Sequence, residues 1–302
     1  MKRDFLDLWD ITRDELFYLL KRAEEFKRGA RSDALKGKVV ALLFTKPSTR
    51  TRVSFEVGVR KLGGESLFLH EKELQSSRGE ETADTARTLS RYVDALVVRN
   101  HSHAALKELA LYASIPVVNA LTELSHPCQT LSDLFTLKET FGRLEGLKLA
   151  WLGDGNNVCN SLMVGCAMAG VDLTVATPLG HEPNAYYYEK ARRIARETGA
   201  RIELTHDPEE AVKDADALYT DVWVSMGQQE KELSAFEPYR VTRELVEKTG
   251  KPALLLHCLP ARKGQEVERE LFEEQAETVF RQAENRLWAQ MALLEHLLGR
   301  SA

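Results

Sequence analysis

The sequence predicts an α/β protein with two domains, each a parallel β-sheet flanked by helices, and an active site in the interdomain cleft. A chain of 302 residues is long enough for two ordinary domains. Short apolar segments, which we interpret as strands, alternate along the chain with longer segments of helical pattern. This alternation is typical of parallel sheets whose strands are connected by helices.

The first alternation opens with a capping-box pattern at Thr12 and Glu15, which predicts the start of a helix. We expect strands at 39–44, 66–69, 95–98 and 116–119, with helices at about 51–62, 82–93, 104–113 and 131–141. Gly63 and Gly142 follow two of these helices and mark their ends.

A second alternation has expected strands at 147–152, 172–176, 202–205, 217–220 and 253–257. The closing segment, 285–298, places apolar residues along one helical face, and we expect it to pack back across the first domain. The predicted domains are therefore 1–142 with 285–302, and 146–284. In parallel open sheets ligands bind beyond the carboxyl ends of the strands, so polar residues that follow strands are candidate site residues.

The composition argues against several functional classes. A net charge of -5 argues against a general nucleic-acid binder, and no apolar run approaches the roughly 18 residues of a membrane span. The first residues lack the apolar core of a signal peptide. The four cysteines form no Cys-x-x-Cys pair, and we interpret them as reduced thiols in a cytoplasmic protein.

The most informative segment is the polar turn that follows the strand at 39–44. It holds Ser48, Thr49, Arg50, Thr51 and Arg52 in succession, where a helix begins. The first N–H groups of a helix have no partner within the helix, and the helix dipole favours an anion there. Hydroxyl and guanidinium groups add further donors, so we interpret the turn as a phosphate site. The alternative is a capped surface helix with two solvated arginines.

Two more segments place polar side chains near a helix start or after a strand. His126 stands before Pro127, a residue that suits the first turn of a helix, and its imidazole can donate to a carbonyl oxygen. The amide of Gln129 can both donate and accept. Asp221 follows the strand at 217–220, where a carboxylate can bind an ammonium group. A structural histidine and a turn-capping aspartate are the alternatives.

The turn after the strand at 147–152 resembles the opening of a dinucleotide fingerprint. Val158 replaces the third glycine of that fingerprint, and the next strand lacks the acidic residue that would bind a ribose, so nicotinamide is not expected. We expect a tight turn that exposes the amides of Asn156 and Asn157 to a polar ligand. A purely structural turn is the alternative.

The segment His257-Cys258-Leu259-Pro260 follows the last predicted strand and leaves three interpretations open. Cys258 is a nucleophile if its pKa is depressed. Zinc binding with the His126 and Cys128 pair is a second interpretation, but the spacings match no standard zinc pattern, and we expect no metal. In the third, the backbone carbonyls of Cys258 and Leu259 face a ligand.

Three other segments are less specific. Arg286, at the start of the last predicted helix, is either a ligand-binding group or part of a solvated face. Gln75 lies in a polar, glycine-bearing segment that is typical of a loop. His101 and His103 are interpreted as surface histidines.

Taken together, these segments resemble the ornithine carbamoyltransferases of the aspartate/ornithine carbamoyltransferase superfamily over essentially the full length of the chain. Ser-Thr-Arg-Thr-Arg at 48–52 and His-Pro-x-Gln at 126–129 are shared by the whole superfamily. Asp-x-x-x-Ser-Met-Gly at 221–227 and His-Cys-Leu-Pro at 257–260 separate ornithine enzymes from aspartate enzymes. An aspartate enzyme should instead show arginines for a second carboxylate.

The resemblance implies transfer of a carbamoyl group from carbamoyl phosphate to the side-chain amine of L-ornithine, giving L-citrulline and phosphate. The amine would attack directly, with no cofactor, metal or covalent enzyme intermediate, in a homotrimer or an assembly of trimers that serves arginine metabolism. Aspartate transcarbamylase is the nearest rival. A catalytically silent binding relative is the alternative of a different class, and it is disfavoured because His126, Arg286 and Cys258 are all present.

The resemblance also implies a role for each matching residue. The phosphate would be held by Ser48, Thr49, Arg50, Thr51 and Arg99, with Gln75 reaching the site of a neighbouring subunit. The carbonyl oxygen would be surrounded by Thr51, Arg99, His126 and Arg286. The carbamoyl amide would be bound by Gln129 and the backbone of Cys258 and Leu259.

For the acceptor, the resemblance assigns the amino-acid end of ornithine to Asn157, Asp221, Ser225 and Met226. The groups expected to take part in catalysis are Arg99, His126, Asp221, Cys258 and Arg286. Among these, Asp221 and Cys258 would handle the proton of the attacking amine. Arg52 would form a structural ion pair and would not contact a ligand.

Overall fold

Two parallel β-sheets organise the part of the chain that the structure describes. The structure is a computed structural model and describes residues 2–70, 72, 79–224 and 233–299. The chain divides into a first unit, residues 1–135 with 285–302, and a second unit, residues 136–284. Each unit contains one of the two sheets. The predicted fold class, α/β with two parallel sheets flanked by helices, is therefore confirmed.

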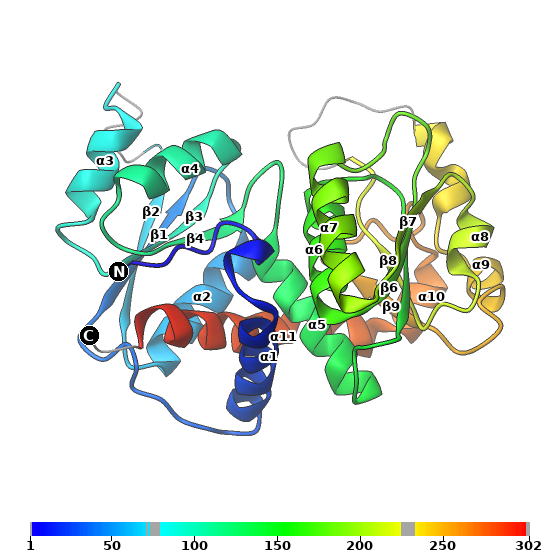
Figure 1. Cartoon of the computed structure of the whole chain (residues 1–302), viewed down its shortest axis with the longest axis horizontal. Coiled ribbons are helices and arrows are strands. Elements are labelled where there is room, and N and C mark those ends of the chain that lie inside the picture. Colours follow the sequence, from blue (N-terminus) through cyan, green and yellow to red (C-terminus); the bar gives the residue numbers. More distant parts are fainter. Residues whose placement is uncertain (1, 71, 73–78, 225–232, 300–302) are drawn as a thin grey trace. The chain divides into compact units, whose positions relative to one another are not determined.

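The sheet of the first unit has the strand order β2-β1-β3-β4, and its neighbouring strands are parallel. Helices α3 (Thr82–Leu89) and α4 (His103–Tyr112) pack on the face that carries Ala41 and Leu43 (Figure 1). The strands are β1 (Val39–Phe44), β2 (Glu65–His70), β3 (Ala95–Arg99) and β4 (Val117–Leu121). The other helices with residues in this unit are η1 (Leu8–Asp10), α1 (Arg13–Lys27), α2 (Thr49–Lys61), α5 (Pro127–Phe141) and α11 (Ala276–Leu298).

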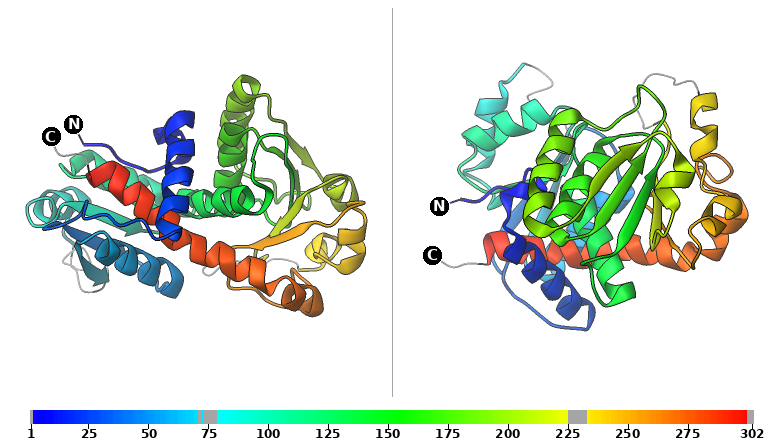
Figure 2. Two further views of the ribbon diagram at one scale, coloured as in Figure 1. Left: turned by 90° about the horizontal axis from the view of Figure 1, so that it is seen from below. Right: turned by 45° about the vertical axis from the view of Figure 1, so that its right-hand side comes forward.

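Helix α1 and the carboxyl-terminal part of α11 lie side by side in the first unit (Figure 2). The guanidinium group of Arg22 on α1 donates to both carboxylate oxygens of Glu295 on α11, over 2.5 Å and 3.0 Å. Such a two-bond pair fixes geometry as well as contributing energy. Met291, one turn before Glu295 on α11, packs against Gly58 of α2. A Cβ atom at Gly58 would lie 3.2 Å from Met291 Cγ. Helix α11 is therefore held against both α1 and α2.

The sheet of the second unit has the strand order β7-β6-β5-β8-β9, again with parallel neighbours. Its strands are β5 (Lys148–Leu152), β6 (Asp172–Ala176), β7 (Ile202–Thr205), β8 (Ala217–Thr220) and β9 (Leu254–His257). Its helices are α6 (Asn157–Ala169), α7 (Ala185–Thr198), α8 (Pro208–Val212), η4 (Leu233–Tyr239), α9 (Arg243–Glu247) and α10 (Arg269–Glu274). Figure 1 shows α6 and α7 on one face of this sheet and α8 and α9 on the other.

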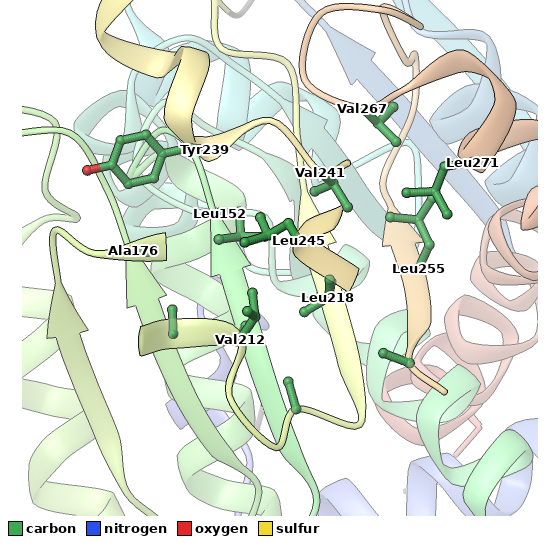
Figure 3. Close-up of a cluster of buried hydrophobic side chains, with 14 of the residues drawn as sticks. Leu152, Ala176, Val212, Leu218, Tyr239, Val241, Leu245, Leu255, Val267 and Leu271 are labelled. Carbon is green, nitrogen blue, oxygen red and sulfur yellow. The ribbon is translucent and has the colours of Figure 1, made fainter. Parts of the chain in front are cut away.

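A cluster of buried side chains fills the space between this sheet and the helices α8, α9 and α10 (Figure 3). Leu152 and Leu218 contribute from the central strands, and Leu245 and Leu271 contribute from α9 and α10. Burying apolar surface at roughly 25 cal/mol per Å² stabilises this arrangement. The cluster packs against strands β5 and β8, and the predicted site residues Asn157 and Asp221 come after these two strands.

Most predicted elements are confirmed, with shifted ends. The strands predicted at 39–44, 172–176, 202–205 and 217–220 are observed with those bounds. Helix α5 begins at Pro127 and not at residue 131, because the fixed φ of proline suits the first helical position. Helix α3 stops at Leu89, before a turn that leads to residue 93. Helix α11 starts at Ala276, earlier than its apolar stripe indicated.

The interpretation of His103 as a surface residue is wrong. Its side chain is buried, with Nε2 3.3 Å from a carboxylate oxygen of Asp7 and Nδ1 3.0 Å from Thr122 Oγ1. His103 is the first residue of α4, and Asp7 comes from the amino-terminal segment that runs beside β4. Asp7 is far from His103 in the sequence, so the polar residues around His103 did not indicate that the side chain is buried. His101 is exposed, as expected.

Among the described helices, none is both long enough and apolar enough to span a membrane.

Candidate active site

The predicted phosphate site is the start of helix α2, directly after strand β1. Ser48 is the N-cap, and its hydroxyl oxygen accepts a hydrogen bond from the N–H of Thr51 over 3.3 Å. The first backbone bond of the helix runs from Arg52 N to Ser48 O, so the N–H groups of Thr49 and Arg50 precede it. A helix start of this kind favours a bound anion.

The side chain of Arg52 makes its contacts within the protein, with Glu56 and Phe68. Its Nε donates to Glu56 Oε1 over 2.9 Å, and its guanidinium carbon lies 3.7 Å from the ring centre of Phe68. Both contacts hold the side chain on the surface of α2 and β2. The prediction that Arg52 forms a structural ion pair is confirmed.

Two arginines meet at the hydroxyl group of Thr51. Arg286 Nη2 donates to Thr51 Oγ1 over 3.2 Å, and Arg99 Nη1 donates to the same oxygen over 3.5 Å. Arg99 is the last residue of β3, and Arg286 lies on α11. Thr51 and Arg286 are both buried. Positive charge therefore gathers beside the anion-binding start of α2.

The guanidinium group of Arg286 is oriented by two buried amides. Gln129 Oε1 accepts from Arg286 Nη1 over 3.2 Å, and Gln290 Oε1 accepts from both Nε and Nη2 over 3.3 Å and 3.1 Å. Gln290 Nε2 in turn donates to Ser54 Oγ on α2 over 2.7 Å. These contacts restrict Arg286 to one orientation before any ligand arrives, which reduces the entropy lost on binding. Arg286 is thus not part of a solvated face.

His126 is buried immediately before helix α5 and stays neutral. Burial lowers the pKa of its imidazole well below the usual value, and the positive charges of Arg286, Arg99 and Arg50 lower it further. A neutral imidazole has one donor and one acceptor nitrogen. His126 can therefore donate a hydrogen bond to a carbonyl oxygen without adding a charge.

In the second unit, Asp221 follows β8 and is held by Asn156. Asp221 Oδ2 accepts from Asn156 Nδ2 over 2.7 Å, while Asn156 Oδ1 accepts from the N–H groups of Val158 and Cys159 at the start of α6. The expectation that Asn156 presents its amide to a ligand is wrong, because both ends of the buried amide are used within the protein. Asn157 is the first residue of α6.

Steric contacts explain why a glycine, Gly155, stands in the turn before Asn156. A Cβ atom at Gly155 would lie 2.2 Å from the backbone nitrogen of Pro183 and 2.4 Å from the carbonyl carbon of Glu182. Neither backbone atom can move aside easily. Gly155 therefore lets the 182–183 segment pack against the turn that carries Asn156.

The segment after β9 is fixed by a buried histidine. His257 Nδ1 accepts from the N–H of Leu259 over 2.9 Å, so the proton of the neutral ring lies on Nε2, which is 3.0 Å from Glu266 Oε1. Leu259 has a φ of 61° and precedes a cis bond to Pro260. The contact from Nδ1 holds Leu259 in this uncommon conformation, which sets the direction of the neighbouring carbonyl groups.

Asp221, His257 and Cys258 place one potential metal-ligand atom each within 4.8 Å of one another. Both nitrogens of His257 are already used, by Leu259 N and Glu266. A metal would have to displace one of these contacts. The Asp221 carboxylate and the Cys258 thiol, which also lie within that distance, are both groups that can exchange a proton.

The predicted site residues therefore form two groups within their own units. The first unit carries Ser48, Thr49, Arg50, Thr51, Arg99, His126, Gln129 and Arg286, and the second carries Asn157, Asp221, Cys258 and Leu259. Gln75, Ser225 and Met226 lie outside the described residues.

The sequence interpretation did not include Gln290 and Asp133, each four residues after a predicted site residue on the same helix. Gln290 follows Arg286, and Asp133 follows Gln129, with Gln129 Nε2 donating to Asp133 Oδ1 over 2.8 Å. Residues at this spacing face the same side of a helix. A search for polar partners at four-residue spacing would have found both.

Two family models match the chain and together cover most of it. The carbamoyl-P binding domain of aspartate/ornithine carbamoyltransferase matches residues 3–139, and the Asp/Orn binding domain of the same family matches residues 145–297.

Similar proteins extend over the same length. An ornithine carbamoyltransferase of Aquifex aeolicus is 58% identical over 300 residues, covering 98% of each chain. One of Carboxydothermus hydrogenoformans is 50% identical over 304 residues, again covering 98% of each. The solved structure of ornithine carbamoyltransferase from Pyrococcus furiosus has a TM-score of 0.95 and 46% identity, and covers 100% of this chain and 98% of that one.

The two matching domain models, one of them for a carbamoyl-P binding domain, place the chain in the class of carbamoyltransferases. The chain belongs to the aspartate/ornithine carbamoyltransferase family. Its resemblance to the ornithine carbamoyltransferases, predicted from the motifs at 221–227 and 257–260, is confirmed.

Proposed function

We propose that this protein transfers the carbamoyl group of carbamoyl phosphate to the side-chain amine of L-ornithine, giving L-citrulline and phosphate. The observation that carries the proposal is the meeting of Arg99 and Arg286 at Thr51, beside the start of α2. Carbamoyl phosphate is an anion with a good leaving group, so positioning and charge neutralisation supply most of the catalysis.

The phosphate is bound at the start of α2 by Ser48, Thr49, Arg50 and Thr51, together with Arg99. The geometry that supports this is the N-cap at Ser48, which leaves the following N–H groups at the helix start. Gln75 of a neighbouring subunit completes the phosphate site. As the phosphate leaves, the arginines neutralise the charge that grows on it.

The carbamoyl group is held by donors at its oxygen and acceptors at its amide. Thr51, Arg99, His126 and Arg286 surround the carbonyl oxygen, while Gln129 and the backbone carbonyls of Cys258 and Leu259 accept from the amide. Neutral His126 donates to the oxygen, and the arginines supply the positive charge. The conformation of Leu259, held by His257 Nδ1, supports the role of the backbone carbonyls.

Ornithine is bound by its amino-acid end through Asn157, Asp221, Ser225 and Met226. Its side-chain ammonium has an ordinary pKa near 10.4, by analogy with lysine, and must lose a proton before it attacks. Asp221 and Cys258, whose potential ligand atoms lie within 4.8 Å, are placed to handle that proton. The amine nitrogen then forms a bond to the carbonyl carbon, and the bond from that carbon to the phosphate oxygen breaks. Activity should therefore rise from neutral to alkaline pH.

Each of the two substrates is bound mainly by one part of the chain. Residues 1–142 with 285–302 form the carbamoyl phosphate-binding domain, and residues 146–284 form the ornithine-binding domain. The protein works as a homotrimer or an assembly of trimers, as its resemblance to the family implies, with Gln75 serving a neighbouring subunit. It acts in the cytoplasm, a reducing compartment in which cysteines such as Cys258 stay reduced.

The test is a steady-state assay of citrulline formation from carbamoyl phosphate with a panel of amine acceptors. We expect activity with L-ornithine and none with L-aspartate, putrescine or N-acetylornithine. Activity with aspartate alone would replace the proposal with the aspartate enzyme. If no acceptor releases phosphate from carbamoyl phosphate, the protein is a silent binding relative.

A further inference from the structure

Asp133 is a buried carboxylate with no assigned role, one helical turn beyond Gln129 on α5. Gln129 Nε2 donates to Asp133 Oδ1 over 2.8 Å, and both side chains are buried within the first unit. We propose that Asp133 is a positioning residue that fixes the Gln129 amide with its oxygen toward the acyl group, and thereby selects an acyl phosphate that carries N–H groups. This inference rests on the proposed function.

The orientation of the Gln129 amide follows from the chemistry of its two neighbours. A carboxylate accepts hydrogen bonds only, so the NH₂ end of the amide must face Asp133. A guanidinium group donates only, so the oxygen end must face Arg286, from which Oε1 accepts over 3.2 Å. Turning the amide over would set two donors against each other and two acceptors against each other. Asp133 and Arg286 therefore hold one orientation between them.

A role limited to helix stability does not account for Asp133. An acidic residue stabilises a helix through the dipole only in the first turn, and α5 begins at Pro127, so Asp133 lies beyond that turn. A buried carboxylate is also costly unless it is hydrogen-bonded. An apolar pair at 129 and 133 would pack without that cost. The buried polar pair is consistent with a requirement for a fixed acceptor at Gln129.

The fixed acceptor distinguishes two acyl phosphates of similar size. The NH₂ group of carbamoyl phosphate donates to Gln129 Oε1, whereas the methyl group of acetyl phosphate cannot donate. Acetyl phosphate offers no donor to the second lone pair of this buried oxygen, whose first lone pair is used by Arg286, and the lost hydrogen bond weakens binding roughly tenfold. The phosphate half of both ligands is the same, so this ratio reports on the acyl pocket alone.

Substitution of Asp133 by Asn keeps the shape of the side chain but removes one of the two constraints on the Gln129 amide and leaves only the one from Arg286. The asparagine amide can donate or accept, so it can pair with either end of the Gln129 amide. Substitution of Gln129 by Met removes the acceptor with little change in volume. If Asp133 acts through Gln129, adding Asp133→Asn to Gln129→Met should change selectivity no further. A direct role for Asp133 would make the two effects add.

The experiment measures two ratios for wild type, Asp133→Asn, Gln129→Met and the double variant. One is Ki for acetyl phosphate over KM for carbamoyl phosphate, and the other is Ki for inorganic phosphate relative to wild type. Asp7→Asn is the matched control, since Asp7 is also a buried aspartate of the first unit, with a carboxylate oxygen 3.3 Å from His103 Nε2. Should Asp133→Asn not fold, Asp133→Ser takes its place in the same cycle.

We expect the first ratio to fall roughly tenfold or more in both single variants and no further in the double variant, with inorganic phosphate binding and Asp7→Asn near wild type. An unchanged ratio in Asp133→Asn overturns the inference, and so do additive effects or an equal loss of all three phosphate ligands. Wild-type citrulline formation is measured first. A wild type that makes citrulline while Asp133→Asn keeps its ratio overturns only this inference, whereas one that makes none overturns the proposed function.

Discussion

Arg286 Nη2 lies 3.2 Å from Thr51 Oγ1, which joins residues 235 positions apart in the sequence. The contact attaches the carboxyl-terminal helix α11 to the anion-binding start of α2. Gln290 holds the same guanidinium group from one turn further along α11. Helix α11 thus brings a charged group from the end of the chain to a helix start in its first half.

Replacing Arg286 by Lys should impair catalysis although the charge is kept. Lysine has one compact ammonium group and cannot bond Thr51, Gln129 and Gln290 together as the planar guanidinium group does. We expect kcat/KM for carbamoyl phosphate to fall roughly 100-fold to 1,000-fold. Arg281→Lys, on the same helix and paired only loosely with Glu139 at 3.9 Å, is the control and should stay within about twofold of wild type. Near-normal rates for Arg286→Lys would contradict the assigned role.

Substitutions at Arg50 and Asp221 should separate the two substrates. Arg50→Ala should raise KM for carbamoyl phosphate roughly a hundredfold, the effect of losing one charged contact. Asp221→Ala should mainly reduce the use of ornithine, measured at saturating carbamoyl phosphate. Arg52→Ala is a matched control for Arg50→Ala, because Arg52 bonds Glu56 on the surface of the helix. Matching defects toward both substrates in the two variants would contradict the proposed division between the domains.

His126 should remain neutral in the folded protein well below pH 6.5. Its pKa is lowered by burial and by three arginines, whereas in the unfolded chain it is near 6.5. As pH falls through 6.5, the unfolded state gains a proton that the folded state does not. The free energy of unfolding therefore falls, by at most about 1.4 kcal/mol per pH unit from this residue. Imidazole ¹⁵N shifts between pH 8 and pH 5.5 check the charge state.

The variant His126→Gln is the control for the predicted fall in unfolding free energy, because glutamine cannot take up a proton. As the pH is lowered from 7 to 5.5, the free energy of unfolding of wild type should fall relative to that of this variant. Above pH 7.5 the difference between the two should be constant. A folded-state His126 that titrates near 6.5 by NMR would disprove the prediction.

The four cysteines should differ in their reaction with iodoacetamide at pH 8. Burial raises the pKa of the Cys128 thiol to about 12 and raises that of Cys159 well above its usual value, and Cys166 is also buried. The thiolate is the reactive form, so these three should react only after unfolding. Cys258 is partly exposed and should be modified first, as mass spectrometry of peptides can measure. Fast labelling of Cys128 in the folded protein would contradict this order.

Gly155→Ala should strongly destabilise the second unit. The new Cβ atom would lie 2.2 Å from Pro183 N, and relieving that clash means moving backbone, at a cost of roughly 3 kcal/mol or more. Gly180→Ala is the control: it has open space but a φ of 81°, so it should cost only about 1–2 kcal/mol. Urea unfolding followed by the fluorescence of the buried Trp151 and Trp223 measures both. Equal losses in the two variants would count against the steric argument.

Several parts of this protein can be predicted from the sequence because their causes are local. The capping box of Thr12 and Glu15 starts α1, and the apolar run at 39–44 is β1. The start of α2 is predictable for the same reason, since Ser48 and the residues after it carry both the N-cap and the cationic groups. These signals act within a few residues, so no knowledge of the fold is needed to read them.

Only the tertiary structure decides which of these groups work together. It buries His103 against Asp7, uses both ends of Asn156 within the second unit, and places Asp133 behind Gln129 as its hydrogen-bond partner. Each outcome depends on which surface a helix or turn packs against, and packing is set by the whole chain. The sequence by itself predicted a phosphate site at the turn that begins with Ser48. The fold determined that Arg286 reaches that turn, because a hydrogen bond between Arg286 and Thr51, so far apart in the sequence, requires α11 to lie against α2.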